Sequence, residues 1–197
     1  MRNPRTFAEL DAEEQQIVDA ALQASANAYA PYSGFAVGAA VRVRTVDGKR
    51  KLIKGANFEN AAYGVGICAE VAALCSANAQ GQFEIDAIAV VGHKFTSPTD
   101  SSQIVRPCGR CRQLISEAET LSGARIPITV YSCNGDLSRI VDEPISELLP
   151  DAFGPRNLGL DKSWPASRKE LVAAVKDLLQ RKLRDFAAHR GASRKRA

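Results

Sequence analysis

The sequence predicts an α/β fold, in which a mixed sheet of about five strands lies between layers of helices as a three-layer αβα sandwich. Apolar residues recur at helical spacing through residues 8–29. Residues 85–91 and 126–132 are almost continuously apolar, as expected for strands that are buried on both faces. Asp47-Gly48 lies between two further strand-like segments and is a hairpin signal.

Each element has its own signals for where it begins and ends. Pro31 ends the first helix, because the residue before a proline disfavours helical geometry. Gly81 closes the second helix, and Pro107 begins the third, where its missing N–H is not needed. Helices are predicted at 8–29, from Cys68 to Ala79, from Pro107 to about Thr120 and at 145–149. Strands are predicted at 35–45, 51–57, 85–91, 126–132 and 138–141.

The C-terminal part of the chain predicts one more helix. Residues 157–166 have the composition of a linker, and Ser167 followed by Glu170 is a capping-box signal. Apolar residues then form one helical stripe to about residue 188: Leu171, Ala174, Val175, Leu178, Leu179 and Phe186. From Arg190 the sequence is basic and is expected to be disordered.

Charge is distributed unevenly over the 197 residues, whose net charge is +4. Residues 157–197 carry 11 Lys and Arg against 4 Asp and Glu, whereas residues 1–156 carry 15 against 18. We therefore expect a domain at 1–156 and a linker with a basic C-terminal helix and tail at 157–197. The mild acidity of the first part does not favour nucleic-acid binding.

Three further features concern location. No apolar run approaches the roughly 18 residues that a membrane span needs, and the N-terminus lacks a charged-then-apolar signal pattern. An odd number of cysteines, five, argues against a disulfide framework. The sequence therefore predicts a cytoplasmic protein that has no membrane partner.

Two short segments carry the chemistry, Cys68-Ala69-Glu70 and Pro107-Cys108-Gly109-Arg110-Cys111. Three thiolates leave the fourth position of a tetrahedral zinc open, as in catalytic zinc sites. Both segments lie at predicted helix N-termini, where the helix dipole and free N–H groups favour thiolate. Glu70 follows the first cysteine closely enough to move protons beside the open position. These residues predict a catalytic zinc site, with Glu70 as the proton carrier and Cys68, Cys108 and Cys111 as ligands.

Two simpler explanations of the cysteines remain open. A redox pair at Cys108 and Cys111 would leave Cys68 unexplained. A closed four-cysteine zinc site would need Cys75 or Cys133 as its fourth ligand. Cys75 lies two helical turns after Cys68, about 10 Å further along the axis, and Cys133 ends an apolar run and is expected to be a buried thiol.

Four segments resemble the cytidine deaminase family in its small-subunit form. They are Asn-Phe-Glu-Asn-Ala-Ala-Tyr-Gly-Val-Gly-Ile-Cys-Ala-Glu at 57–70, Tyr-Ala-Pro-Tyr-Ser-Gly-Phe-Ala-Val-Gly-Ala-Ala at 29–40, Pro-Cys-Gly-Arg-Cys-Arg-Gln at 107–113 and Glu-Leu-Leu-Pro-Asp-Ala-Phe-Gly-Pro at 147–155. They occur in the family's order and span about residues 15–156, which the resemblance makes the catalytic domain.

The resemblance implies a zinc-dependent enzyme of pyrimidine salvage. Its small-molecule substrates would be cytidine and 2′-deoxycytidine, deaminated hydrolytically to uridine and 2′-deoxyuridine with release of ammonia. An open zinc site lowers the pKa of water, which could then add to C4 of cytosine. Glu70 would take the proton from water, pass it to ring N3 and help ammonia leave. The family is usually a homotetramer.

The resemblance also implies the residues that contact the substrate. Asn57 and Glu59 match positions that hydrogen-bond the ribose, and Phe35 matches a wall of the pocket. Ala69 would offer backbone contacts to the edge of the base. Phe153 matches an aromatic residue that reaches into the active site of a neighbouring subunit and packs against the base.

One departure from the family pattern concerns charge around the thiolates. An Arg commonly follows the Cys-Ala-Glu segment, but this chain has Val71, and it has Arg110 where a small residue is common. We expect Arg110 to take over as the partner of the thiolates, with Arg112 as the rival donor.

Two alternative functions remain open. The Pro-Cys-Gly-Arg-Cys-Arg-Gln segment and the missing Arg after Glu70 also resemble blasticidin S deaminase, which lacks the Asn-x-Glu-Asn ribose signature that this chain has at 57–60. The first alternative is therefore a deaminase of a modified or antibiotic cytosine nucleoside. The second is a nucleic-acid-binding protein whose zinc is structural.

Overall fold

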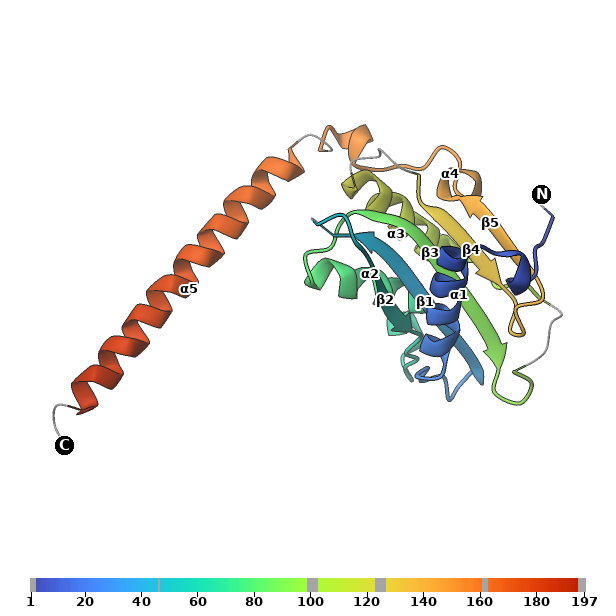
Figure 1. Ribbon diagram of the computed structural model, residues 1–197, viewed down its shortest axis with the longest axis horizontal. Coiled ribbons are helices and arrows are strands. Elements are labelled where there is room, and N and C mark those ends of the chain that lie inside the picture. Colours follow the sequence, from blue (N-terminus) through green and yellow to red (C-terminus); the bar gives the residue numbers. More distant parts are fainter. Residues whose placement is uncertain (1–2, 46, 99–102, 123–126, 161–162, 195–197) are drawn as a thin grey trace. The chain divides into compact units, whose positions relative to one another are not determined.

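The computed structural model describes residues 3–45, 47–98, 103–122, 127–160 and 163–194. Two compact units divide the chain, Met1–Gly154 and Pro155–Ala197. The strands of the first unit are β1 Phe35–Arg44, β2 Arg50–Ala56, β3 Ile85–Lys94, β4 Thr129–Cys133 and β5 Ile140–Pro144 (Figure 1). Its helices are α1 Ala12–Ser25, α2 Ala69–Ala79, α3 Gly109–Leu121 and α4 Ile145–Leu148, with short 3-10 turns at Phe7–Glu9 and Tyr63–Val65.

The five strands form one mixed sheet in the order β2-β1-β3-β4-β5. Strands β3 and β4 are parallel, with Ala87 opposite Thr129, and the other neighbouring pairs are antiparallel. Helix α1 packs on one face of the sheet, and α2 and α3 pack on the other (Figure 1). The predicted α/β class, with helix layers around a mixed five-stranded sheet, is confirmed.

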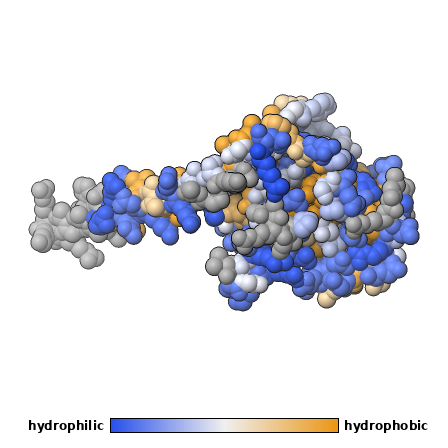
Figure 2. Space-filling model, turned by 90° about the horizontal axis from the view of Figure 1, so that it is seen from above, coloured by the Kyte–Doolittle hydropathy of each residue, from blue (hydrophilic) through white to orange (hydrophobic). Residues whose placement is uncertain are grey.

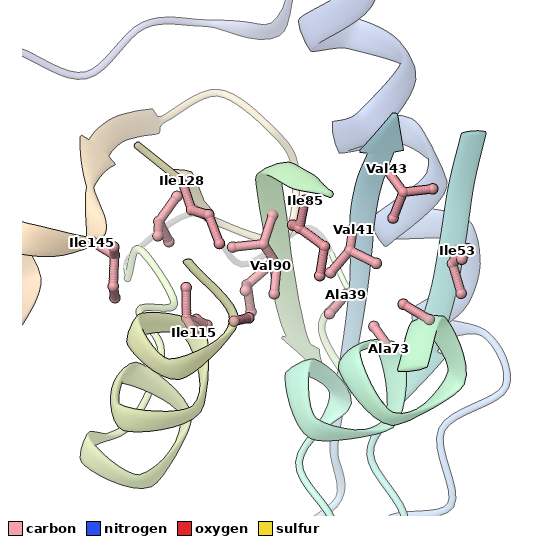
Figure 3. Close-up of a cluster of buried hydrophobic side chains, with 14 of the residues drawn as sticks. Ala39, Val41, Val43, Ile53, Ala73, Ile85, Val90, Ile115, Ile128 and Ile145 are labelled. Carbon is pink, nitrogen blue, oxygen red and sulfur yellow. The ribbon is translucent and has the colours of Figure 1, made fainter. Parts of the chain in front are cut away.

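Strand alternation separates the core into two clusters, one under each helix layer. On β1, Ala39, Val41 and Val43 pack in the cluster with α2 and α3, whereas Ala40 packs in the cluster with α1. Figure 3 shows the α2 and α3 cluster, in which Ala73 and Ile115 come from the helices. Residues Ile85–Val91 of β3 are all buried, which confirms the prediction that this strand is covered on both sides.

A glycine lets each helix layer approach the sheet closely. A Cβ at Gly38 of β1 would lie 2.0 Å from the carbonyl O of Ala21 in α1. A Cβ at Gly55 of β2 would lie 2.3 Å from the backbone N of Ala73 in α2. Backbone cannot move aside as a flexible side chain can, so these two positions set how deeply α1 and α2 sit.

The first helix is shorter than predicted at both ends. Helix α1 begins only at Ala12, because the carboxylate of the preceding Asp11 accepts hydrogen bonds from the N–H groups of Glu13 and Glu14 and caps the helix. The helix ends at Ser25, before Pro31. The N–H of Tyr29 donates instead to the carbonyl O of Asn57, so the chain beyond α1 pairs with the segment that leads to α2.

Strand β5 begins later than predicted, because Ser138 belongs to a turn. The Asp136 carboxylate accepts hydrogen bonds from the backbone N–H and the hydroxyl of Ser138. β5 therefore starts at Ile140 and, as predicted, forms an edge of the sheet. The predicted start of the preceding strand at Ile126 lies outside the described residues.

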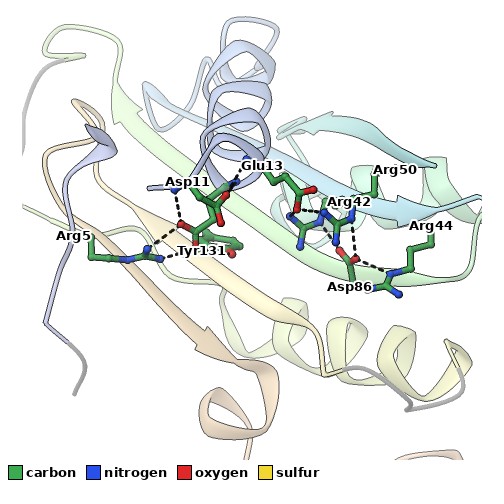
Figure 4. A network of polar contacts seen from close by, with 9 residues as sticks. Arg5, Asp11, Glu13, Arg42, Arg44, Arg50, Asp86 and Tyr131 are labelled. Carbon is green, nitrogen blue, oxygen red and sulfur yellow. Dashed lines mark hydrogen bonds and ion pairs between the residues drawn. The ribbon is translucent and has the colours of Figure 1, made fainter. Parts of the chain in front are cut away.

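Charged side chains on the α1 face of the sheet are paired within the chain (Figure 4). The Arg5 guanidinium donates to Glu14 at 2.9 Å and to Asp142 at 2.8 Å. The buried carboxylate of Asp86 accepts from Arg42 at 2.6 Å and from Arg44 at 3.1 Å. These ion pairs join Arg5 of the N-terminal segment to α1 and β5, and β1 to β3, on one face of the sheet.

The second unit contains a short 3-10 turn at Pro155–Leu158 and helix α5, Trp164–Arg194. The predicted cap at Ser167 is wrong, since the Ser167 hydroxyl lies inside the helix and donates to the carbonyl O of Ser163. Helix α5 continues to Arg194, beyond the predicted end near residue 188, and residues 195–197 lie outside the described residues.

Apolar and polar residues are both exposed along α5 (Figure 2). The exposed apolar residues within it include Leu171, Val172, Val175, Leu178, Leu179, Leu183 and Phe186. Across the described part of the chain, no helix has the length and apolar character that a membrane crossing requires.

Candidate active site

Three cysteines meet where α2 and α3 begin. Cys68 is the N-cap residue of α2, Cys108 is the N-cap residue of α3, and Cys111 lies in the first turn of α3. Their Sγ atoms all lie within 4.8 Å of one another, and those of Cys108 and Cys111 are 3.5 Å apart. This separation fits one zinc ion, whose bonds to sulfur are about 2.3 Å long.

The two helix starts leave backbone N–H groups without a side-chain cap. Neither Cys68 nor Cys108 accepts a capping hydrogen bond through its side chain. Such N–H groups and the helix dipole favour negative charge at this end, so both helices support thiolates where the three sulfurs meet.

The prediction that Pro107 is the first residue of α3 is wrong, because Cys108 occupies the N-cap position and Gly109 is the first helical residue. Pro107 precedes the cap, and its carbonyl O accepts a hydrogen bond from Nε of Arg112 at 2.9 Å. The proline therefore fixes the approach to the helix rather than its first turn.

Glu70 lies in the first turn of α2 and lines the same cavity as Cys68 and Cys108. The residue is 4% exposed. Burial raises the pKa of its carboxyl group, because a charged carboxylate is poorly solvated there. A raised pKa makes this carboxylate a stronger base than an ordinary one, as a group that accepts a proton during catalysis needs to be.

Burial also raises the pKa of the Cys68 and Cys111 thiols. A bound divalent cation opposes this effect, since it stabilises the thiolate directly. Metal binding at this site would therefore release protons.

The other two cysteines lie elsewhere. Cys75 is exposed on α2 and lines a separate apolar groove between α2 and α3. Cys133 is fully buried at the end of β4, as predicted. Among the described residues, neither belongs to the cluster of possible metal ligands.

A cavity of about 450 Å³ opens beside the thiols. Predicted site residues that line it are Phe35, Asn57, Glu59, Cys68, Ala69, Glu70 and Cys108. The fold thus brings together residues from β1, from the segment after β2 and from the starts of α2 and α3.

The two predicted ribose contacts are held by backbone groups. Oδ1 of Asn57 accepts from the N–H of Val37 at 2.9 Å, and its Nδ2 donates to the carbonyl O of Phe35 at 3.0 Å. Oε2 of Glu59 accepts from the N–H groups of Tyr32 and Ser33. Interactions with Ser33 lower the pKa of Glu59, so it is a carboxylate near neutral pH.

Three other predicted residues, Cys111, Phe153 and Arg110, lie outside this lining, and Cys111 is fully buried. The Phe153 residue is 63% exposed, and its carbonyl O accepts from Nε2 of Gln113 at 2.7 Å. Arg110 is exposed and donates to the carbonyl O of Gly66 at 3.3 Å. Among the described residues, Arg110 makes no hydrogen bond to a thiol.

Sequence reasoning missed several residues of the cavity, notably Val37, Val105, Arg106 and Ile67. The apolar ones carry no chemical signal of their own. Arg106 could have been found, because it directly precedes Pro107-Cys108 and is a charged residue at the edge of a metal motif.

Comparison with known proteins identifies the class to which this fold and site belong. Residues 11–123 match the model of the cytidine and deoxycytidylate deaminase zinc-binding region. The chain is a member of this family of zinc-dependent deaminases.

Relatives with known names agree. The chain is 41% identical over 141 residues to cytidine deaminase of Halalkalibacterium halodurans, which covers 72% of this chain and 94% of that one. It is 35% identical over 115 residues to blasticidin-S deaminase of Bacillus cereus, with 58% and 74% covered.

The fold agrees as well. The crystal structure of cytidine deaminase from Burkholderia pseudomallei superposes with a TM-score of 0.59 at 38% identity, and covers 73% of this chain and all of that one.

Proposed function

We propose that this protein hydrolyses cytidine and 2′-deoxycytidine to uridine and 2′-deoxyuridine with release of ammonia. The observation that carries the proposal is the cluster of three thiols, of which Cys68 and Cys108 line a cavity that the buried Glu70 also lines. Bound there by Cys68, Cys108 and Cys111, zinc would supply a Lewis acid that makes water nucleophilic near neutral pH.

Glu70 carries the protons in this proposal. It takes a proton from the attacking water, gives it to N3 of the cytosine ring and later assists the departure of ammonia. Its burial supports the role, because burial raises the pKa of the carboxyl group and so makes the carboxylate a stronger base. The reaction is balanced, because each cytidine consumes one water molecule and yields one uridine and one ammonia.

The sugar would lie against Asn57 and Glu59, with Phe35 at the wall and the Ala69 backbone at the base edge. The bonds to Tyr32 and Ser33 use Oε2 of Glu59, which leaves Oε1 without a partner among the described residues. A site built to pair a hydroxyl group discriminates strongly against ligands that lack it, which favours nucleosides over free cytosine.

Arg110 would balance the negative charge of zinc with three thiolates. Arg110 lies between Cys108 and Cys111 in the sequence. Its guanidinium donates to the carbonyl O of Gly66, two residues before Cys68. A rotation of this long side chain would bring it to the sulfurs once they are ionised.

Assembly as a homotetramer would complete the cavity with Phe153 from a neighbouring subunit. Exposed aromatic residues support this proposal: Tyr63 and Phe58, which line the cavity, are 83% and 56% exposed, and Phe153 is 63% exposed. A surface of this kind is typical of a protein interface.

Residues 1–156 would be the catalytic domain, and residues 157–197 would be a linker with a basic helix and tail that chemistry does not need. Every proposed site residue precedes residue 157. Pyrimidine salvage in the cytoplasm is the role that we propose for the enzyme.

An ammonia-release assay of the full chain tests the reaction. The substrates are cytidine, 2′-deoxycytidine, blasticidin S and a cytosine-containing oligonucleotide, with zinc content measured on the same sample. We expect turnover of the two nucleosides. Turnover of blasticidin S alone would support the antibiotic alternative, which the 35% identity to a blasticidin-S deaminase favours. Oligonucleotide binding without ammonia release would contradict the proposal.

A further inference from the structure

Arg106 joins the cavity to the far edge of the sheet. It lines the cavity beside Cys108, and its guanidinium forms an ion pair with Glu143 of β5. Glu143 is 7% exposed. Among the described residues Arg106 is its ion-pair partner, so the pair neutralises a buried charge.

Three consecutive residues attach this segment to three different parts of the fold. The N–H of Val105 donates to the carbonyl O of Cys133 in β4 at 3.0 Å. Arg106 binds Glu143 in β5, and the carbonyl O of Pro107 accepts from Arg112 in α3. The next residue is Cys108. This segment, 105–107, is called the strap below.

Of these three attachments, only the one at Arg106 uses a side chain of the strap; Val105 and Pro107 are attached through backbone atoms. Removing one partner of a buried ion pair leaves an uncompensated charge, which is strongly destabilising. The carboxylate would then draw in water or shift toward solvent, and the strap would lose its link to β5. Proline fixes its own φ angle, which removes one of the backbone rotations between Arg106 and Cys108.

We propose that Arg106 is a positioning residue, which, through Glu143, holds Cys108 and the cavity wall in the geometry that zinc retention and deamination require. The proposal rests on the proposed function. Displacements of about 1 Å at a reacting centre can lower turnover about 100-fold. The substrate would still bind to Asn57 and Glu59, which belong to other segments, so KM should change less than kcat.

The experiment compares Glu143→Gln and Arg106→Met with Asp86→Asn in the zinc-loaded full chain. Asp86 is a matched control, because it is also a buried carboxylate paired with an arginine, but it lies on the α1 face away from the thiols. Zinc release to a chelator, kcat, KM and unfolding are measured for each protein. We expect Glu143→Gln and Arg106→Met, called the strap variants below because both break the ion pair of the strap, to release zinc about 10-fold faster and to lose about 10- to 100-fold in kcat.

Asp86→Asn should lower stability while zinc release and kcat stay as in the unaltered protein. Equal zinc release in the strap variants and the unaltered protein would overturn the proposal, and so would equally fast release from Asp86→Asn, since the effect would then be general destabilisation.

If Arg106→Met does not fold, Arg106→Lys replaces it: this variant keeps the charge and should release zinc at a rate between those of Glu143→Gln and the unaltered protein. A rate equal to that of Glu143→Gln would overturn the proposal. An unaltered chain that neither holds zinc nor deaminates cytidine would instead refute the proposed function.

Discussion

Helix α1 and the two helices of the site begin in opposite ways. At α1, the Asp11 carboxylate accepts from the N–H groups of Glu13 and Glu14, and Glu14 reaches back to the N–H of Asp11. At α2 and α3 the capping position is occupied by Cys68 and Cys108, and no side chain caps the helix. One face of the sheet uses its helix start for stability, and the other leaves its helix starts available for chemistry.

Removal of a thiol at the open helix starts should have the largest effect. Cys68→Ala, Cys108→Ala and Cys111→Ala should each lose zinc and all measurable deamination, because two sulfurs cannot hold the ion in a tetrahedral site. Metal analysis of the purified proteins measures this. Cys75→Ala and Cys133→Ala are the controls and should keep zinc. Zinc loss in Cys75→Ala, with Cys68→Ala unaffected, would mean that the ligands are wrongly assigned.

Glu70→Gln should lower turnover by about 10²- to 10⁴-fold, since general acid–base groups typically contribute that much. Zinc content and fold should be retained, because the amide has the shape of the carboxyl group. Glu14→Gln is the comparison on the α1 face. It weakens the ion pair with Arg5 and should lower the free energy of unfolding but leave turnover unchanged. Near-normal turnover in Glu70→Gln would contradict the mechanism.

Gly55→Ala and Gly38→Ala test the two faces with one added methyl group each. Both should destabilise the fold by about 1–3 kcal/mol, the usual cost of overpacking. Gly55→Ala should also reduce turnover, because it pushes on α2, which carries Glu70. Denaturant unfolding and steady-state kinetics separate the two effects. An equal loss of turnover in folded Gly38→Ala would show that both faces position the site.

Asp11→Ala should have the smallest effect. Loss of an N-cap typically costs about 1 kcal/mol, which denaturant unfolding measures. Zinc content and kcat should stay unchanged, since the cap of α1 is separated from the site by the sheet. A change in zinc content would mean that the two kinds of helix start are coupled.

Much of the fold could be predicted from the sequence because its signals are local. The continuous apolar run of β3 and the Asp47-Gly48 turn each act over a few residues. The end of α1 could not be predicted, because it depends on pairing of Tyr29 with Asn57, 28 positions further on. Helix α5 begins at Trp164, before the capping-box residues Ser167 and Glu170 that the sequence offered, and the residues at its true start form no capping box.

Residue types at fixed spacing predicted the proposed site, since thiols and a carboxyl group have few other reasons to occur in that pattern. The structure adds the backbone bonds of Asn57 and the ion pair of Arg106 with Glu143. Neither is visible in a motif, because each joins segments that only the folded sheet brings together.

The parallel pairing of β3 with β4 has a consequence for the order of folding. Parallel neighbours need a long connection, and α3, with Cys108 and Cys111, lies in that connection. Cys68 precedes β3, so the three sulfurs come from both sides of β3 in the sequence and meet through contacts as distant as this pairing. Distant pairings form slowly. We therefore expect the metal to be captured late in folding, so that each newly made chain depends on zinc for its final stability and not for reaching its topology.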